Sequence, residues 1–229
     1  MVARYEPMLA TQWTEPFDHP DWEFEVKWDG FRTIAYVGPG GTSLRSRRGL
    51  DLAGRFPEVA GMRFRRDVVV DGEIVAFGDN GVPSFHLLGY RPANFVAFDL
   101  LFDGEDLCAR GLEERRSRLA DLSLPAPAVA SELVPEDGLA LFEAVKARGM
   151  EGIVAKRNGS TYQPGVRSPD WRKIAVWRRG RAVVGGYLAG DRSRAKTFGS
   201  LLLGLWKEDG LHFIGAVGTG FSDSVLADL

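Results

Sequence analysis

The sequence predicts an α+β fold: antiparallel sheets with a few flanking helices, followed by a smaller β-rich module. Most of the 229 residues form short β-prone runs separated by glycine and proline. Only two stretches repeat apolar residues at helical spacing. The length suits one large domain with a smaller one, and a hydrophobic content of 45 % supports a real core.

Aromatic and β-branched residues mark the candidate strands. These are residues 23–28, 31–37, 68–77, 94–102, 152–156, 173–177, 182–188, 200–206 and 211–217. The clearest helix covers residues 136–148, where Leu139 and Phe142 lie on one face, and a second is expected at residues 112–122. The proline-rich residues 122–134 are expected to be a connection without regular structure.

The composition changes after Trp177, where a basic link leads into a glycine-rich segment with no convincing helix. We therefore expect two domains, residues 1–178 and residues 179–229. Roughly 50 residues is short for an independent domain. The second module is expected to be the opening part of a small β-barrel or sheet, incomplete at the end of this chain.

The remaining composition narrows the class of protein. The single cysteine, Cys108, excludes an internal disulfide and fits a reducing cytoplasm, and the three histidines lack the spacing of a zinc site. No export signal or apolar run of about 18 residues is present, so no membrane association is expected. The net charge of −2 does not itself indicate a nucleic-acid binder. Residues 156–181, however, hold eight cations against Asp170 alone, which is typical of a solvated face or a phosphate-binding stripe.

The most informative stretch lies around Lys27. Apolar residues alternate there with Glu25, Lys27 and Asp29, so a strand would place these three charged side chains on one face. Asp29 and Gly30 are typical of a two-residue hairpin turn into the next strand. A lysine held between two carboxylates beside a tight turn indicates either a surface ion pair or a nucleophile.

Five further segments carry charged or aromatic residues at expected strand ends and turns. They are the arginine pair in residues 46–49, Asp-Gly-Glu in residues 70–73, the aromatic strand start of residues 98–104, the Glu-to-Lys strand of residues 151–157 and the polar stretch of residues 162–173. Each is ordinary alone. Together with Lys27 they supply a nucleophile, a stacking ring, metal carboxylates and phosphate-binding cations, the parts of a nucleotidyl-transfer site.

This order of motifs resembles the covalent nucleotidyltransferase superfamily of ATP-dependent DNA ligases and mRNA capping enzymes. The signature Lys-x-Asp-Gly-x-Arg stands at residues 27–32. Residues 151–157 and 162–168 are similar to segments of bacterial end-joining ligases of the ligase D type. The resemblance implies a nucleotidyltransferase (adenylation) domain of antiparallel sheets with flanking helices, followed by a partial OB-fold β-barrel.

The resemblance also implies roles for individual residues. Lys27 would attack the α-phosphate of ATP and form a lysine–AMP intermediate. Glu25 would accept a hydrogen bond from the adenine amino group, and Phe98 would stack on the adenine. Arg32 would hold the ribose and, together with Arg47, the 5′-phosphate at a nick in double-stranded DNA.

The remaining roles concern metal and phosphate charge. Glu73 and Glu151 are similar to the family's ribose and metal carboxylates, which would bind Mg²⁺ or Mn²⁺. Lys156 and Lys173 would neutralise charge on the phosphates. Ala175 departs from the pattern, because the family usually has a basic residue there, and Arg172 or Arg178 would have to substitute.

A second departure is the absence of the C-terminal motif that orients pyrophosphate during self-adenylylation. We therefore expect a weak first step and slow sealing of nicks that already carry AMP. RNA ligase or capping-type chemistry, and a non-catalytic module that binds DNA ends, are the alternatives. The resemblance implies action as a monomer in the bacterial cytoplasm, at the nucleoid, beside an end-joining polymerase, a nuclease or an end-binding protein.

Overall fold

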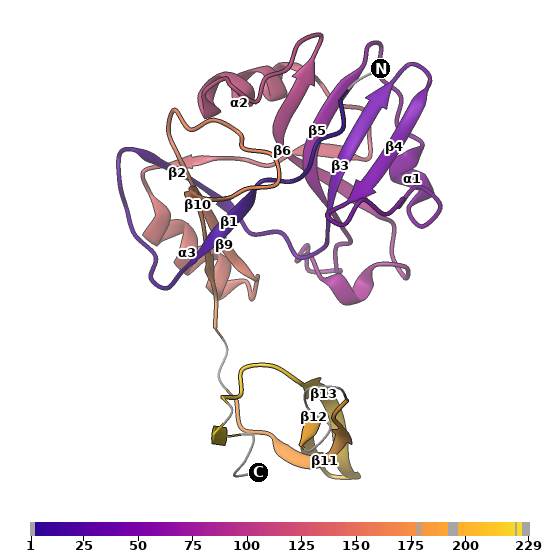
Figure 1. The fold of residues 1–229 in the computed structure, drawn as a ribbon, viewed down its shortest axis with the longest axis vertical. Helices are drawn as coiled ribbons and strands as arrows, with labels where there is room; N and C mark the ends of the chain where they lie inside the picture. The colour runs from indigo at the N-terminus through magenta and orange to yellow at the C-terminus, as the bar shows by residue number, and fades with distance from the viewer. Residues whose placement is uncertain (1–2, 178–179, 192–196, 223, 226–229) are drawn as a thin grey trace. The chain divides into compact units, whose positions relative to one another are not determined.

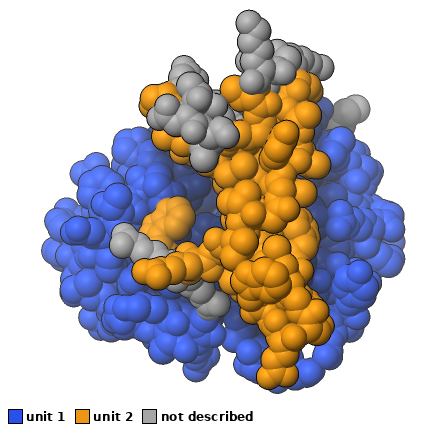
Figure 2. Space-filling model, turned by 90° about the horizontal axis from the view of Figure 1, so that it is seen from below, with its two compact units in different colours: residues 1–176 blue, residues 177–229 orange. Residues whose placement is uncertain are grey.

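Two five-stranded sheets form most of the chain (Figure 1). The computed structural model describes residues 3–177, 180–191, 197–222 and 224–225. The chain divides into two compact units, residues 1–176 and 177–229, coloured separately in Figure 2. The predicted domain boundary, between residues 178 and 179, lies outside the described residues.

The first sheet, here called sheet A, has the strand order β1-β10-β9-β2-β8. Its strands are β1 (Leu9–Trp13), β2 (Trp22–Val26), β8 (Val134–Pro135), β9 (Gly152–Arg157) and β10 (Arg167–Ala175). The edge strand β1 runs parallel to β10, and the other neighbours are antiparallel. Sheet A therefore joins segments from both ends of unit 1.

The second sheet, sheet B, has the order β4-β3-β5-β6-β7. Its strands are β3 (Phe31–Gly38), β4 (Gly41–Ser46), β5 (Val68–Val75), β6 (Asn94–Asp103) and β7 (Ala128–Ala130). Only the β6–β7 pair among these neighbours is parallel. Strand β7 lies within the proline-rich segment that was predicted to be a connection, and that prediction is wrong there.

Helices cover the outer face of each sheet. The helices α1 (Pro57–Ala60) and α2 (Leu112–Asp121) share an apolar core with sheet B, through side chains such as Val59 and Leu119. The helix α3 (Gly138–Ala147) packs on sheet A through Val145 and its neighbours. A short 3₁₀ turn, η1 (Phe85–Leu87), follows β5. None of the helices in the described part of the chain is long and apolar enough to cross a membrane.

A third apolar core lies between the two sheets. Ile34 and Leu101 of sheet B meet Trp171 of sheet A there, together with Met8 from the segment that leads into β1. Alternation along each strand explains this arrangement, because every strand of a two-sided sheet sends alternate side chains to opposite faces. The inner faces of the two sheets therefore look toward one another.

Unit 2 is an antiparallel sheet of the strands β11 (Val183–Ala189), β12 (Phe198–Lys207) and β13 (Gly210–Val217), in the order β11-β12-β13. These strands correspond to the last three that the sequence predicts. The structure confirms the α+β class, both predicted helices and all nine predicted strands. The largest shift is in β10, which begins at Arg167 rather than at residue 173.

The predicted hairpin at Asp29 and Gly30 is wrong. The strands β2 and β3 do not pair, because β2 belongs to sheet A and β3 to sheet B. Gly30 is needed for a different reason: a Cβ atom at this position would collide with the carbonyl oxygen of Ile74 in β5. The glycine thus permits a close backbone approach where the chain crosses from one sheet to the other.

A fully buried ion pair fixes α2 on sheet B. Arg115 of α2 donates two hydrogen bonds to Asp99 of β6, of 2.8 and 2.9 Å. It also donates to the carbonyl oxygens of Arg110 and Ser160, at 2.6 and 2.8 Å. Buried charges are costly unless they are paired and hydrogen-bonded, and here both conditions hold.

Removing one partner should therefore be strongly destabilising. We expect Arg115→Leu to lower the free energy of unfolding by about 3–5 kcal/mol, because Asp99 would stay buried without a counter-charge. The control is Arg118→Leu on the same helix, whose partners Glu105 and Glu114 are exposed, with an expected loss below about 1 kcal/mol. Urea denaturation measures both, and equal losses would contradict this account.

Candidate active site

A cavity of about 200 Å³ opens between the inner faces of sheets A and B. Of the nine residues that the sequence predicts for a site, seven line it: Glu25, Lys27, Arg32, Arg47, Glu73, Phe98 and Lys173. The other two, Glu151 and Lys156, form ion pairs with lining residues. The structure therefore brings the whole predicted set together, although it comes from segments up to about 150 residues apart in sequence.

Lys27 stands directly after β2. Its backbone N–H donates to the carbonyl oxygen of Gly152 at 2.8 Å, and its Nζ forms an ion pair with Glu151 Oε1. The prediction that Glu25, Lys27 and Asp29 share one face holds for Glu25 and Lys27, which both line the cavity, and is wrong for Asp29, because β2 ends at Val26. Asp29 instead accepts a hydrogen bond from the backbone of Phe85 at 2.9 Å.

Glu25 and Lys156 form a buried pair behind the cavity wall. Lys156 Nζ lies 2.8 Å from Glu25 Oε1, donates to the carbonyl oxygen of Phe98 at 3.0 Å, and sits 4.3 Å from the ring centroid of Trp171. Burial lowers the pKa of Lys156, and Glu25 opposes that shift. In this structure Lys156 positions Glu25 and Phe98 and does not line the cavity.

The second oxygen of Glu25 has a different role. Glu25 Oε2 is buried and has no hydrogen-bond partner among the residues that the structure describes. An ionised carboxylate can only accept hydrogen bonds, so a buried oxygen of this kind requires a donor. Because Glu25 lines the cavity, a ligand that carries an N–H group fits this position.

Arg32 is held by a network that the sequence did not predict. Its Nε and one Nη donate to Asp71 at 2.7 and 2.6 Å, and its guanidinium lies 4.4 Å from the ring centroid of Phe98. The Tyr162 hydroxyl donates to Asp71 at 2.6 Å and accepts from the backbone N–H of Met8 at 2.8 Å. Burial, then the charge of Asp71, raises the pKa of Tyr162. Asp71 and Tyr162 lie in segments that the sequence analysis singled out. Their role in positioning Arg32 becomes visible only in the folded structure, where both are buried beside it.

Glu73 lies in the same cavity, opposite Arg32 in the strand register. Burial raises the pKa of Glu73 to about 8; the Arg32 and Lys27 charges oppose this shift, and Asp71 and Glu151 add to it. At neutral pH the carboxyl is therefore largely protonated, and a nearby cation would favour its ionised form.

The sequence predicts that Glu73 and Glu151 bind a divalent metal ion. No group of three or more His, Cys, Asp and Glu side chains is assembled like a self-sufficient metal site within the described residues. Glu73 and Glu151 fit Mg²⁺ in another way, since this ion is commonly bound by one or two carboxylates together with substrate phosphates and water. The donor set thus fits a metal that arrives with a nucleotide.

Besides Lys27 and Arg32, three further cations line the same cavity: Lys173, Arg167 and Arg47. Burial and the charges of Lys27, Arg167 and Arg47 lower the pKa of Lys173. Arg167 was not predicted as a site residue, and it supplies a cation that Ala175 cannot.

Of the two substitutes expected for that missing base, Arg172 lies elsewhere. Its guanidinium rests 4.1 Å from the ring centroid of Trp13 and 4.2 Å from that of Trp22. The other, Arg178, is outside the described residues. The expected basic stripe is thus divided, because Lys156 is buried and Arg172 packs on aromatic rings.

Two family models match the sequence: the ATP dependent DNA ligase domain over residues 7–175, and the ATP dependent DNA ligase C terminal region over residues 194–229. The chain belongs to the ATP-dependent DNA ligase family. The match includes the cavity and all nine predicted residues, and it confirms the resemblance stated from the motifs.

Relatives of this chain are known from mycobacteria. The chain is 39 % identical, over 97 % of its length, to the multifunctional non-homologous end joining DNA repair protein LigD of Mycobacterium tuberculosis, of which it spans 31 %. It is 35 % identical to DNA ligase C of the same organism, covering 93 % of this chain and 65 % of that protein. The chain therefore spans about a third of the LigD relative it matches.

A solved structure of mycobacterial DNA ligase D complexed with ATP and MES matches the fold, with a TM-score of 0.71 and 36 % identity. The match covers 98 % of this chain and 75 % of that one. It confirms the predicted fold class, a nucleotidyltransferase region followed by an OB-fold-like region.

The raised pKa of Glu73 predicts a pH dependence of stability. The unfolded carboxyl ionises near pH 4.5, whereas the folded one stays protonated up to about pH 8. Over that interval the folded state binds the extra proton, so this group makes the protein less stable as pH rises. Glu73→Gln removes the effect. We expect the melting temperature of the variant to gain on wild type by at least about 2–4 °C between about pH 5 and 8, since one pKa unit is about 1.4 kcal/mol.

Calorimetry at a series of pH values measures this difference. Glu143→Gln is the matched control, because Glu143 is an exposed carboxylate that pairs with Lys146 on α3. A Glu73→Gln difference that is constant over the whole pH range would contradict a raised pKa.

Proposed function

We propose that this chain is an ATP-dependent DNA ligase that seals nicks between a 3′-hydroxyl and a 5′-phosphate through a covalent Lys27–AMP intermediate. The observation that carries the proposal is the single cavity that holds Lys27, the unpaired oxygen of Glu25 and the cations Arg32, Arg47 and Lys173. A lysine nucleophile, an acceptor for a base and cations for phosphate are what nucleotidyl transfer needs.

The adenine of ATP fits the unpaired oxygen of Glu25. The exocyclic amine of adenine is a donor, whereas guanine carries a carbonyl oxygen at that ring position and would face the carboxylate oxygen with a second acceptor. Phe98 lines the cavity and would stack on the base, while Arg32, whose guanidinium lies over the Phe98 ring in this structure, would hold the ribose. These contacts favour ATP over GTP.

Mg²⁺ or Mn²⁺, held by Glu73 and Glu151 together with phosphate oxygens, would supply charge that favours a neutral lysine and stabilises the pentacovalent phosphate. Lys27 must leave Glu151 and lose its proton before it attacks. The Nζ–phosphorus bond then forms as the bond to pyrophosphate breaks. Lys173 and Arg167 line the cavity where the negative charge builds up.

The later steps transfer AMP to DNA. An oxygen of the 5′-phosphate at the nick attacks the AMP phosphorus, and the bond to Lys27 breaks. The 3′-hydroxyl then attacks the 5′-phosphate and expels AMP. Arg47 and Arg32 would hold the 5′-phosphate, with Arg32 kept in place by Asp71. Contacts to phosphate rather than to bases make binding independent of sequence and dependent on salt.

We assign residues 1–178 to the adenylation domain and residues 179–229 to an OB-fold-like region. By similarity to LigD, the setting would be repair by end joining. We also propose that the chain acts as a monomer in the bacterial cytoplasm, at the nucleoid. An end-joining polymerase, a nuclease or an end-binding protein would act beside it. The family match favours DNA over RNA ligation or capping.

Incubation with α-labelled ATP and Mg²⁺, followed by denaturing electrophoresis, tests the proposal. We expect a labelled band for wild type and none for Lys27→Ala, because the label is held through Nζ. The matched control is Lys146→Ala, which removes an exposed lysine on α3 and should label like wild type.

A pre-adenylated nick distinguishes the alternatives. A ligase should seal this substrate without ATP, since AMP is already attached to the DNA. Binding of the nick without labelling and without sealing would instead support a non-catalytic DNA-end-binding module and overturn the proposal.

A further inference from the structure

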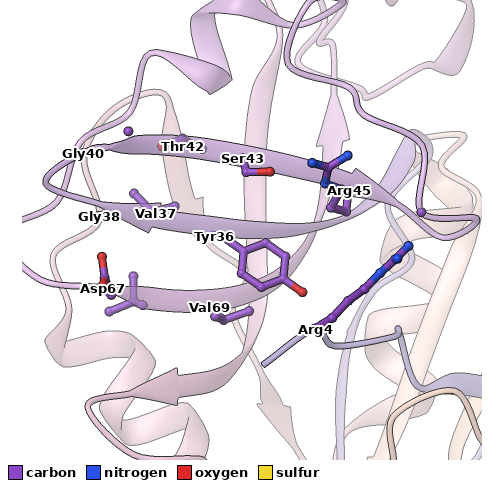
Figure 3. Close-up of a pocket in the computed structure, with 13 residues that line it drawn as sticks. Arg4, Tyr36, Val37, Gly38, Gly40, Thr42, Ser43, Arg45, Asp67 and Val69 are labelled. Atoms are coloured by element: carbon purple, nitrogen blue, oxygen red, sulfur yellow. The ribbon is translucent and has the colours of Figure 1, made fainter. Parts of the chain in front are cut away.

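A second and larger hollow, of about 830 Å³, lies on sheet B (Figure 3). Ser43 and Arg45 project into it from β4, Tyr36 from β3 and Val69 from β5, with Arg4 at its edge. These residues do not line the active-site cavity. The hollow is open, so it suits a long ligand that runs across a surface rather than a small enclosed one.

The hollow and the active-site cavity occupy the same face of sheet B. Arg32 and Tyr36 are four residues apart in β3, so their side chains point to one side, the former into the cavity and the latter into the hollow. On β4, Leu44 is buried in the outer core, which leaves Ser43 and Arg45 on the inner face. β4 is the edge strand of sheet B, with Arg45 partly exposed and Arg47 exposed along it, so a ligand in the cavity can continue along this edge into the hollow.

The segment before β1 crosses the face between the two sites. The backbone N–H of Tyr5 donates to the Tyr36 hydroxyl at 2.8 Å, and Arg32 donates to the carbonyl oxygen of Met8 at 3.2 Å. This anchoring places Arg4 beside the hollow. Gly49, at φ +78°, makes room for it, because a Cβ atom there would collide with the Arg4 guanidinium.

The charges form a row. Arg45 lines the hollow, and Arg47, two residues further along the same segment, lines the cavity. Arg45 is part-exposed and makes an ion pair of 3.4 Å with the exposed Asp51, so its guanidinium is available to a stronger partner. Asp67 is the carboxylate among the described lining residues, and it belongs to the Gly38 end of the hollow, away from Arg47.

We propose that the hollow binds the phosphodiester backbone of the nicked duplex, in continuation of the strand whose 5′-phosphate Arg47 would hold. This inference rests on the proposed function. Arginine forks, hydroxyl groups and backbone N–H groups are the usual protein contacts to DNA phosphates, and the hollow offers Arg4, Arg45 and Ser43. The hollow would thus be a second phosphate-binding subsite next to the reacting 5′-phosphate. The DNA strand would lie along β4.

The test is the affinity for a nicked duplex that cannot be sealed, measured by fluorescence anisotropy over a range of salt concentrations. We expect Arg45→Gln to weaken binding roughly 3- to 10-fold and to reduce the slope of log K against log salt by about one, the effect of one lost phosphate contact. The matched control is Arg91→Gln, because Arg91 is similarly exposed and pairs with the exposed Asp79 at 2.9 Å. It should bind like wild type.

A second variant guards against misfolding. Nothing lies within 4 Å of a Cβ atom placed at Gly40, which also lines the hollow, so Gly40→Asp should fold normally and repel phosphate. A melting temperature equal to that of wild type checks this. We expect Gly40→Asp to weaken DNA binding as Arg45→Gln does.

Two results would overturn the inference. One is that Arg45→Gln and Arg91→Gln change affinity and salt slope equally, which would mean that the hollow acts only through net charge. The other is that Gly40→Asp, with the melting temperature of wild type, binds the nicked duplex with wild-type affinity, which would mean that the DNA backbone does not enter the hollow. Failure of wild type to label with ATP and to seal a pre-adenylated nick would instead reject the proposed function.

Discussion

The bidentate pair between Arg32 and Asp71 is the interaction on which the arrangement of the site depends. It lies between the two sheets, where the low dielectric strengthens a well-formed pair and makes an incomplete one costly. Tyr162 and the backbone of Met8 complete the hydrogen bonding of this pair. The network therefore ties sheet B to the segment that leads into β1, and it sets where Arg32 lies against Phe98.

Two other carboxyl groups around the cavity, those of Glu25 and Glu73, are not fully compensated for their burial. Glu25 has one oxygen without a partner among the described residues, and burial raises the pKa of Glu73. Such groups cost stability in the ligand-free protein, and ligands that supply a donor or a cation would recover that cost. Under the proposed function, the site is preorganised to bind a nucleotide and its metal. Lys27 is held by its ion pair with Glu151 until the nucleotide binds.

The sequence predicted nine of the strands, the two main helices and most members of the site, because alternation and motif order are local properties; it did not predict β1, β4, β7 or β8. It could not predict that β2 and β3 enter different sheets, since Asp29 and Gly30 satisfy the pattern of a tight turn equally well. It also missed Asp71, Tyr162 and Arg167. Their roles come from burial and from contacts between segments far apart in the chain. Arg172, which was expected in the site, instead packs on the rings of Trp13 and Trp22.

The central claim is that this cavity makes Lys27, and no other lysine, the nucleophile. Lys156 and Lys173 lie in or beside the same site, so position and exposure rather than residue type must decide. The most direct measurement is peptide mapping by mass spectrometry of the protein after incubation with ATP and Mg²⁺. The account predicts AMP on the peptide that contains Lys27 alone. AMP on Lys156 or Lys173 would contradict it.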